Sequence, residues 1–315
     1  MENMFTAIAP ATFLDDTIKT FDVFYKSGEE KMELYCVKGR TLPSDIRNRL
    51  HEENTIDSLY IHTKDKPLYE SYLEEILGGI LQKPELSTAE KSKLVYEIIE
   101  RNAISLFGNP KPKKIQHFKE LLFITVDFVL KDSSALHDLI NLTSFDYSLH
   151  NHSINVGIYS MGIILEVLKV KPNLNCHETV AGYFLHDIGK YSTPIEILQK
   201  QGKLTPIEWK FIKRHPEAGC EVLQRYGALT KEAEIIVIQH HERYSGKGYP
   251  HGLAGKDIHF LAKICTIADV FDALTSHRPY RGEYTSFDAL KIMKNELYQE
   301  FDPALFSLFV KLLRK

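Results

Sequence analysis

A histidine and an aspartate stand side by side, His186 and Asp187, in the mostly apolar run 183–190. The apolar residues before the pair indicate a buried helix end, and Gly189 indicates where that helix stops. Neighbouring side chains on a helix point about 100° apart, so the two can bind one ion only if it lies between their directions. The run therefore predicts either a metal-binding pair in a helical core or a buried histidine with a carboxylate partner.

Helical patterns dominate the chain beyond about residue 115. Apolar residues recur there three and four positions apart, and strand-like alternation does not occur. The segments with this pattern are residues 115–130, 134–142, 154–170, 179–188, 205–213, 218–226, 231–240, 260–275 and 286–298. We expect an all-α helical bundle, a fold that builds metal sites between facing helices.

The first 110 residues predict a different and smaller unit. Three short segments with alternating apolar residues favour strands, namely residues 21–25, 32–37 and 59–62. Helical patterns cover residues 43–53 and begin again at Pro67. The segment contains neither a nucleophile beside a base nor a glycine-rich phosphate loop. We therefore expect a small α+β module with a regulatory or sensory role.

The expected boundary between the two parts lies in a helix-breaking stretch. A capping-box pattern, Ser87 to Glu90, first opens an amphipathic helix that connects the module to the second part of the chain. The stretch from Gly108 to Lys114 then interrupts the helical pattern with two prolines. We therefore expect two domains, residues 1–110 and residues 111–315.

The composition argues against several classes of function. The formal net charge of −3 gives no broad basic surface, so we expect no nucleic-acid polymer as a partner. The longest apolar run, residues 121–130, is far shorter than the ~20 residues of a membrane span, so we expect no membrane contact. The first residues lack the pattern of a signal peptide, and the four cysteines are scattered, which is typical of reduced thiols in a cytoplasmic protein.

Further residues that can bind metals lie at helix ends or within apolar helices of the second half. They are His152, His215, His240, His241 and Asp269. Each alone is more often a buried residue with one polar partner, although an unpaired buried carboxylate such as Asp269 would be destabilising. Together with the first pair they make five histidines and two aspartates on separate helices. Mixed imidazole and carboxylate ligands suit iron, manganese, nickel, cobalt or zinc.

At these residues the sequence resembles the HD-GYP subgroup of the HD metal-dependent phosphohydrolase superfamily. The matching blocks occur in family order between about residues 115 and 315. They are His152-Ser153, His186-Asp187-Ile-Gly-Lys190, His215-Pro216, His240-His241-Glu242-Arg243, Gly246-Lys-Gly-Tyr-Pro250, Ala268 to Ser276 and Arg278-Pro-Tyr-Arg281. The resemblance implies an HD-type helical bundle and a bacterial phosphodiesterase that hydrolyses cyclic di-GMP with a hydroxide activated by two metal ions. Iron or manganese is expected first, with zinc, nickel or cobalt as alternatives.

The resemblance also assigns ligands by matching positions. One ion is expected to be held by His152, His186, Asp187 and Asp269, and a second by Asp187 as a bridge with His215, His240 and His241. Asp187 and Lys190 are the expected catalytic residues, the lysine placing a positive charge on a phosphate oxygen. Some family members bind a third ion through a glutamate four residues before the first histidine. Ser148 occupies that position, with His150 as a possible substitute, so we expect two ions.

Substrate contacts are expected from five residues of the matching blocks. They are Lys190, Tyr249, Pro250, Arg278 and Arg281. The glycines of the Gly246–Pro250 loop permit a tight turn, and the loop either borders the nucleotide pocket, contacts a protein partner or only closes the bundle. We expect Asp272 to support a ligand histidine. We expect Glu242 and Arg243 to form a structural ion pair.

Two other functions remain open at this point. The first is a cyclic di-GMP receptor or protein-interaction module with weak turnover. Ser245 leaves room for it, because the family usually has aspartate at this position of the loop. The second is an HD hydrolase that acts on another nucleotide.

Overall fold

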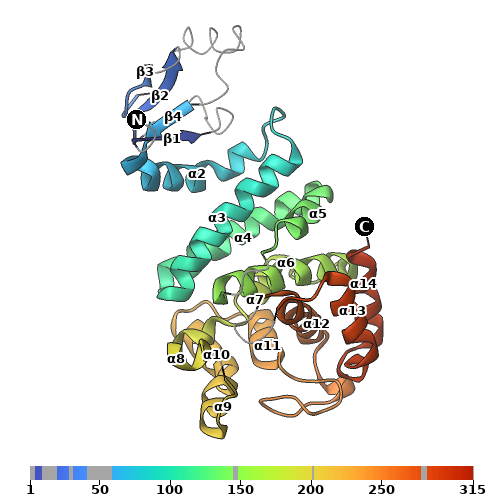
Figure 1. The fold of residues 1–315 in the computed structure, drawn as a ribbon. Coiled ribbons are helices and arrows are strands. Elements are labelled where there is room, and N and C mark those ends of the chain that lie inside the picture. The colour runs from blue at the N-terminus through green and yellow to red at the C-terminus, as the bar shows by residue number, and fades with distance from the viewer. Residues whose placement is uncertain are drawn as a thin grey trace. The chain divides into compact units, whose positions relative to one another are not determined.

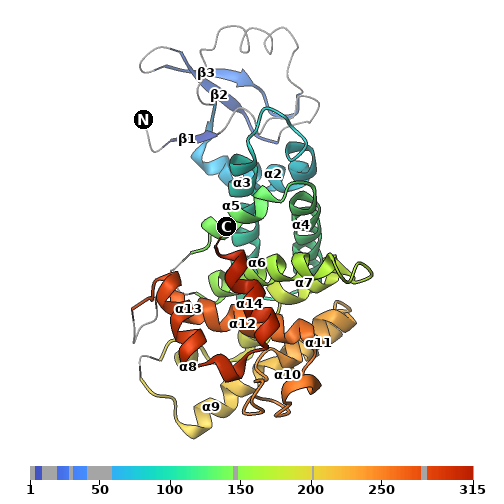
Figure 2. The same cartoon turned by 90° about the vertical axis from the view of Figure 1, so that its right-hand side faces the viewer.

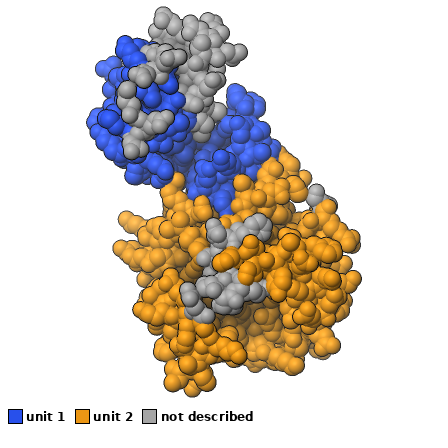
Figure 3. All heavy atoms as spheres, in the orientation of Figure 1, with its two compact units in different colours: residues 1–98 blue, residues 99–315 orange. Residues whose placement is uncertain are grey.

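The computed structural model describes residues 4–8, 20–27, 31–40, 59–144, 148–200, 202–277 and 282–314. The chain divides into two compact units, residues 1–98 and residues 99–315 (Figure 3). The helix predicted over residues 43–53 and the predicted substrate contacts Arg278 and Arg281 lie outside the described residues. Within the ranges given above, no helix combines the length and the apolar character that crossing a membrane requires.

The first unit contains a small antiparallel sheet with the strand order β1-β4-β2-β3. Its strands are β1 (Phe5–Ile8), β2 (Val23–Ser27), β3 (Lys31–Cys36) and β4 (Leu59–His62). In the register, Phe24 of β2 pairs with Leu34 on one side and with Tyr60 on the other. Helix α2 (Lys66–Ile80) follows the 3-10 turn η2 (Thr63–Asp65) and buries apolar residues three and four positions apart. The α+β character predicted for this part is confirmed, and β1 is an additional strand whose four residues carry too little pattern to predict it.

Helix α3 (Thr88–Gly108) begins at the predicted capping box. The backbone N–H of Ser87 donates to the Glu90 carboxylate at 2.9 Å, and the backbone N–H of Glu90 donates to Ser87 Oγ at 3.3 Å. The helix extends across the division between the two units. The glycine- and proline-containing stretch after it leads to α4 (Pro112–Lys131) within the second unit. The assignment of separate roles to residues 1–110 and 111–315 stays a prediction.

The second unit is the predicted helical bundle, which confirms the fold class. At its centre α6 (Leu149–Leu168) packs against α7 (Cys176–Phe184) and α12 (Phe260–Thr275) (Figures 1 and 2). The other helices are α5 (Ser134–Asn141), α8 (Ile195–Leu198), α9 (Pro206–Lys213), α10 (His215–Arg225), α11 (Lys231–Gln239), α13 (Ser286–Asn295) and α14 (Pro303–Leu312). The described part of this unit also contains three short 3-10 segments, η3 (Ile188–Ser192), η4 (Gly255–Asp257) and η5 (Tyr298–Glu300).

The helix predicted over residues 179–188 ends earlier than expected. Helix α7 stops at Phe184, and His186 and Asp187 lie in the turn before η3 rather than on a helix. Gly189 has a packing role there, because a Cβ atom on it would lie 2.0 Å from the carbonyl oxygen of His215. The backbone of η3 therefore touches the first turn of α10, an approach that no larger residue permits.

The backbone at His215 is helical although a proline follows it. The residue before a proline is disfavoured in the helical region, yet α10 begins at His215. Arg214, which precedes it, is itself helical with φ −81° and ψ −16°. Proline is tolerated in a first turn because its missing N–H would have no partner inside the helix. His215 is thereby fixed at a helix start rather than on a loop.

Candidate metal centre

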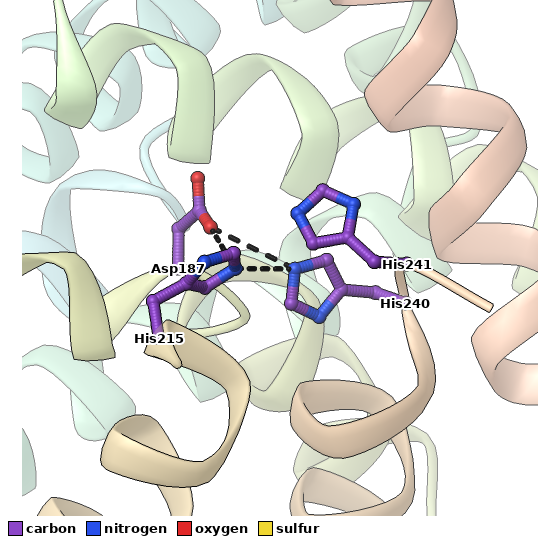
Figure 4. A group of neighbouring side chains, drawn as sticks. All are labelled: Asp187, His215, His240 and His241. Carbon is purple, nitrogen blue, oxygen red and sulfur yellow. Dashed lines mark hydrogen bonds and ion pairs between the residues drawn. The ribbon is translucent and has the colours of Figure 1, made fainter. Parts of the chain in front are cut away.

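The seven predicted metal ligands come together in the second unit from five parts of the bundle. His152 lies in the first turn of α6, His186 and Asp187 in the turn after α7, and His215 at the start of α10. His240 and His241 follow α11, and Asp269 lies in α12. Within two groups that share Asp187, all the potential ligand atoms lie within 4.8 Å of one another. The first group consists of His152, His186 and Asp187. The second group consists of Asp187, His215, His240 and His241 and is drawn in Figure 4.

The two carboxylate oxygens of Asp187 face different groups. Its Oδ2 lies 3.3 Å from Nε2 of His152 and 3.5 Å from Nε2 of His186. Its Oδ1 lies 3.1 Å from Nε2 of His215 and 3.7 Å from Nε2 of His240. This is the arrangement that a bridging carboxylate needs.

Asp269 also contacts both groups, which the sequence did not predict. Its Oδ1 lies 3.3 Å from Nε2 of His152, and its Oδ2 lies 3.5 Å from Nδ1 of His241. The sequence had assigned Asp269 to one ion with His152. The neighbouring His241 approaches it through Nδ1, whereas the other histidines direct Nε2 inward.

Three histidines are oriented by the same local hydrogen bond. In each, Nδ1 meets the backbone carbonyl three residues earlier, at 2.8 Å for His186, 2.7 Å for His215 and 2.8 Å for His240. A carbonyl oxygen only accepts, so Nδ1 carries the proton and the lone pair lies on Nε2. The backbone at three helix ends thereby selects the tautomer that binds metal ions.

His152 is oriented by a carboxylate instead. Its Nδ1 lies 2.7 Å from Oδ2 of Asp272, one helical turn beyond Asp269 on α12. The side-chain amide of Asn155 donates to the other oxygen of Asp272 at 2.6 Å, and Ser276 Oγ donates to Oδ2 at 3.2 Å. Asp272 thus stands where a supporting carboxylate was expected.

Burial and charge set the protonation states of the cluster. Burial lowers the pKa of His186 to about 3 and also depresses the pKa values of His215 and His241. Burial alone would raise the pKa of Asp187, but Lys190, His186 and His152 hold it well below its usual value. Hydrogen bonding to His152 does the same for the pKa of Asp269. At neutral pH His186, His215 and His241 are therefore neutral and the two carboxylates are ionised. His152 differs, because burial lowers its pKa but hydrogen bonds to Asp187, Asp269 and Asp272 outweigh this and hold the pKa well above its usual value.

This donor set fits divalent metal ions. The buried Nε2 of His186 and Oδ1 of Asp187 have no hydrogen-bond donor among the described residues. Nε2 of His215 lies 3.0 Å from Nε2 of His240, so the two lone pairs fixed by the backbone face each other. Buried acceptors without donors are destabilising unless a cation binds between them. The described residues thus provide the sites that the implied metal ions need.

The loop after His241 is fixed by Glu242. Its carboxylate, 1% exposed, accepts the backbone N–H of His251 at 2.7 Å and of Leu253 at 2.9 Å. The expected ion pair with Arg243 is not formed between these two described residues, because both carboxylate oxygens serve loop amides. A Cβ on Gly248 would lie 2.4 Å from the backbone nitrogen of Arg243, so only glycine lets the loop cross there. The acidic residue directly after the histidine pair is the signal that could have indicated this clamp.

Three more residues singled out from the sequence lie around the centre. Tyr249, whose peptide bond to Pro250 is cis, packs its ring against that of His241, with the ring centroids 4.6 Å apart and the ring planes tilted by 32°. Lys190 Nζ lies 2.5 Å from Oδ2 of Asp187. Ser245, where the family usually has aspartate, donates to the Glu300 carboxylate at 2.6 Å and so holds the loop in another way.

The position at which some family members have the third-ion glutamate has a structural role in this chain. Ser148 caps α6 by accepting the backbone N–H of Asn151 at 3.1 Å. His150, the substitute considered above, belongs to neither of the ligand groups found among the described residues.

Comparison with known proteins agrees with this geometry. The family model for the HD domain matches residues 136–305. A cyclic di-GMP phosphodiesterase of Pseudomonas aeruginosa is 37% identical over 183 residues, which are 58% of this chain and 44% of that protein. A cyclic di-GMP phosphodiesterase of Thermotoga maritima is 35% identical over 277 residues, which are 85% of this chain and 74% of that protein. The chain thus spans under half the length of the first relative and about three quarters of the second.

Among solved structures, an HDG"Y"P protein from Bdellovibrio bacteriovorus superimposes with a TM-score of 0.67. The match covers 99% of this chain and 100% of that one at 21% sequence identity, so this likeness concerns the fold alone. The HD domain match includes all the residues of the metal centre. The chain belongs to the HD domain family, and within it to the HD-GYP subgroup.

Proposed function

We propose that this chain is a metal-dependent phosphodiesterase that hydrolyses cyclic di-GMP. The observation that carries the proposal is the convergence of six potential metal ligands in two groups that share Asp187, with Asp269 in contact with both groups. The relatives named cyclic di-GMP phosphodiesterases support the choice of substrate.

The proposed ligand sets correspond to the two groups. His152, His186 and Asp269 would hold one ion and His215, His240 and His241 the second, with Asp187 common to both. Bound divalent ions would supply positive charge to a phosphate and lower the pKa of a water molecule. The mixed imidazole and carboxylate donors favour iron or manganese, with zinc, nickel or cobalt also compatible.

The substrate would enter a cavity that is lined by three of these donors. It has a volume of about 560 Å³ and is lined by His152, His241 and Asp269 together with Lys190 and Tyr249. Pockets of this size suit small organic ligands. We call it the inner cavity.

Two side chains of the inner cavity have roles that their contacts define. Lys190 forms an ion pair with Asp187 and also lines the cavity, so its ammonium can orient the carboxylate and donate to a phosphate oxygen. Burial raises the pKa of Tyr249, so its phenol remains a neutral donor. The rings of Tyr249 and His241 are in tilted contact, and the tyrosine ring therefore limits how the substrate approaches this histidine.

The test combines metal analysis with a panel of substrates. Protein purified without oxygen is analysed for bound metals and then incubated with cyclic di-GMP, other cyclic dinucleotides and mononucleotides. We expect two ions per chain and ring opening of cyclic di-GMP, both lost in Asp187→Ala. Rapid turnover of a different nucleotide, with cyclic di-GMP left intact, would contradict the substrate assignment.

Tight binding of cyclic di-GMP with no product under any metal would identify a receptor instead. Protein binding through the Gly246–Pro250 loop stays a prediction. It can be separated from catalysis by asking whether Tyr249→Ala removes a partner while metal content is retained.

A further inference from the structure

We propose that Trp209 and the cations around it form a subsite for the second nucleotide of a cyclic dinucleotide, the one whose phosphate is not attacked. The inference rests on the function proposed above and adds that the enzyme prefers a cyclic dinucleotide to a mononucleotide. The subsite is a second cavity of about 610 Å³, called here the outer cavity. The residues that matter for the argument are Trp209, Lys210, Lys213, Arg243, Lys247 and Tyr249.

The outer cavity is continuous with the inner cavity. Both are lined by Trp209, Arg243, Lys247 and Tyr249, and both reach the candidate metal ligand His241. A ligand with one phosphate over the metal donors can therefore extend across this shared wall. A mononucleotide would leave the outer cavity empty, whereas a cyclic dinucleotide has a second phosphate and a second base to place in it.

The two cavities differ in their acidic residues. The inner cavity is lined by the carboxylates of Asp269 and Glu300 as well as by three cationic side chains, two of which, Arg243 and Lys247, also line the outer cavity. The outer cavity is lined by four cationic side chains, and none of its described lining residues is acidic. This end therefore favours an anionic group that lies away from the metal centre. The second phosphate of a cyclic dinucleotide meets that requirement.

Packing in the protein core does not explain Trp209. In α9, which is described throughout, no residue is buried, and Trp209 is 46% exposed. The first turn is held by polar contacts, since Thr205 and Glu208 form a capping box and Lys200 pairs with Glu208 at 2.6 Å. An exposed aromatic ring beside cations is the combination that stacks nucleic-acid bases.

Tyr249 connects the subsite to the metal centre. Its ring packs at a tilt against that of His241, and Nζ of Lys213 lies 5.4 Å from the centroid of the tyrosine ring. Lys213 and Trp209 belong to the same helix, so α9 brings a cation and an aromatic surface to this loop together. The arrangement predicts a purine on Trp209 and a phosphate near Lys213 and Arg243.

The chain offers a direct probe of this subsite, because Trp209 is its only tryptophan. Metal-loaded, full-length protein is titrated with a hydrolysis-resistant phosphorothioate analogue of cyclic di-GMP, and the indole fluorescence is monitored. We expect saturable quenching that coincides with binding measured by calorimetry. Binding without any change in fluorescence would overturn the proposal.

Two pairs of variants test the contacts. Trp209→Ala should weaken binding about 5- to 100-fold, and Trp209→Phe should restore most of it, because base stacking depends on an aromatic ring. Phe211→Ala is the matched control, since Phe211 is 49% exposed on the same helix and lines neither cavity. Lys213→Ala should weaken binding and reduce its salt dependence, whereas Lys203→Ala, outside both cavities, should not. If Phe211→Ala weakened binding as much as Trp209→Ala, or Lys203→Ala as much as Lys213→Ala, the subsite would be contradicted.

Steady-state kinetics distinguishes the subsite from a structural role. In Trp209→Ala the ratio of kcat/KM for cyclic di-GMP to kcat/KM for bis(p-nitrophenyl) phosphate should fall, mainly through KM for the dinucleotide. An equal fall for both substrates would mean that Trp209 only supports the fold. If the protein hydrolyses the simple diester but does not bind the dinucleotide, the subsite is contradicted and the hydrolase function is not. If the dinucleotide quenches the fluorescence but no diester is hydrolysed with any metal, the subsite stands and the hydrolase function is contradicted.

Discussion

Nδ1 of His152 lies 2.7 Å from Oδ2 of Asp272, although the two residues are 120 positions apart in the chain. The contact joins the first turn of α6 to α12 and leaves Nε2 of the histidine directed at Asp187 and Asp269. It fixes both the ring orientation and the position of its proton. The histidine is therefore presented to the metal centre by a carboxylate that need not touch an ion.

Asp272→Asn should weaken metal binding about 10- to 100-fold, because an amide cannot hold the His152 proton as the charged carboxylate does. Metal affinity is measured by competition with a chelator, and a thermal unfolding scan checks the fold. Asp127→Asn is the matched control, since Asp127 also pairs with a histidine, His177 at 2.9 Å, but at the surface. Unchanged metal affinity in Asp272→Asn would contradict the supporting role.

Glu242→Gln should loosen the loop from Gly246 to Leu253 without removing a metal ligand. The amide can accept only one of the two backbone N–H groups that the buried carboxylate now accepts. We expect a loss of about 1–3 kcal/mol in the free energy of unfolding. We also expect a higher KM for cyclic di-GMP, with metal content retained.

Denaturant unfolding and steady-state kinetics measure these two effects on Glu242→Gln. Glu296→Gln, at an exposed position of the same unit, is the control and should change neither quantity. A raised KM in the control as well would mean that the effect is not specific to the loop.

Gly189→Ala should be strongly destabilising. Its Cβ would lie 2.0 Å from the His215 carbonyl oxygen and 2.5 Å from the Gly219 nitrogen, and neither backbone atom can move without displacing α10. We expect a loss of about 3 kcal/mol in the free energy of unfolding and a lower metal content, because His215 shifts with the helix. Gly202→Ala, where an added Cβ meets nothing within 4 Å, should be nearly neutral. Similar unfolding midpoints for the two variants would argue against this packing constraint.

Removing metal should lower the unfolding temperature. The centre holds buried acceptors without donors, so ions that bind only the folded chain stabilise it through mass action. At a free metal concentration 100 times the Kd, the expected gain is about 2.7 kcal/mol per site. Calorimetry with and without chelator measures the shift. Asp187→Asn should show little of it, and a full metal-dependent shift in that variant would contradict the shared ligand.

Local sequence patterns predicted most of the fold and the candidate metal ligands, but they did not predict the contacts that bring these residues together. The helix over residues 260–275 and the capping box at Ser87 result from spacing that acts within one element. The turn that carries His186 and Asp187 does not, because it depends on Gly189 touching the backbone of α10. The same reason hides the contact of Asp269 with His241, which joins two segments distant in sequence.

The side chains that hold the loop and the outer cavity were also beyond prediction. Glu242 comes after two histidines and precedes an arginine, so the sequence favoured an ion pair, and only the folded loop shows which amides it accepts. Trp209 reads as one apolar position of a short helix. Its exposure becomes informative only when the cations of the loop from Arg243 to Tyr249 are seen beside it.

Helix α9 is attached to the bundle by charge and capping at its first turn rather than by a buried face. Hydrogen bonds from Lys200 and Thr205 lower the pKa of Glu208 to about 2, so these contacts persist in mildly acidic solution. Exposed ion pairs are screened by salt, however, and segments without buried apolar area open at low free energy. Ionic strength would then act on this protein twice, by shielding the ligand's phosphates and by fraying the very segment that carries the indole.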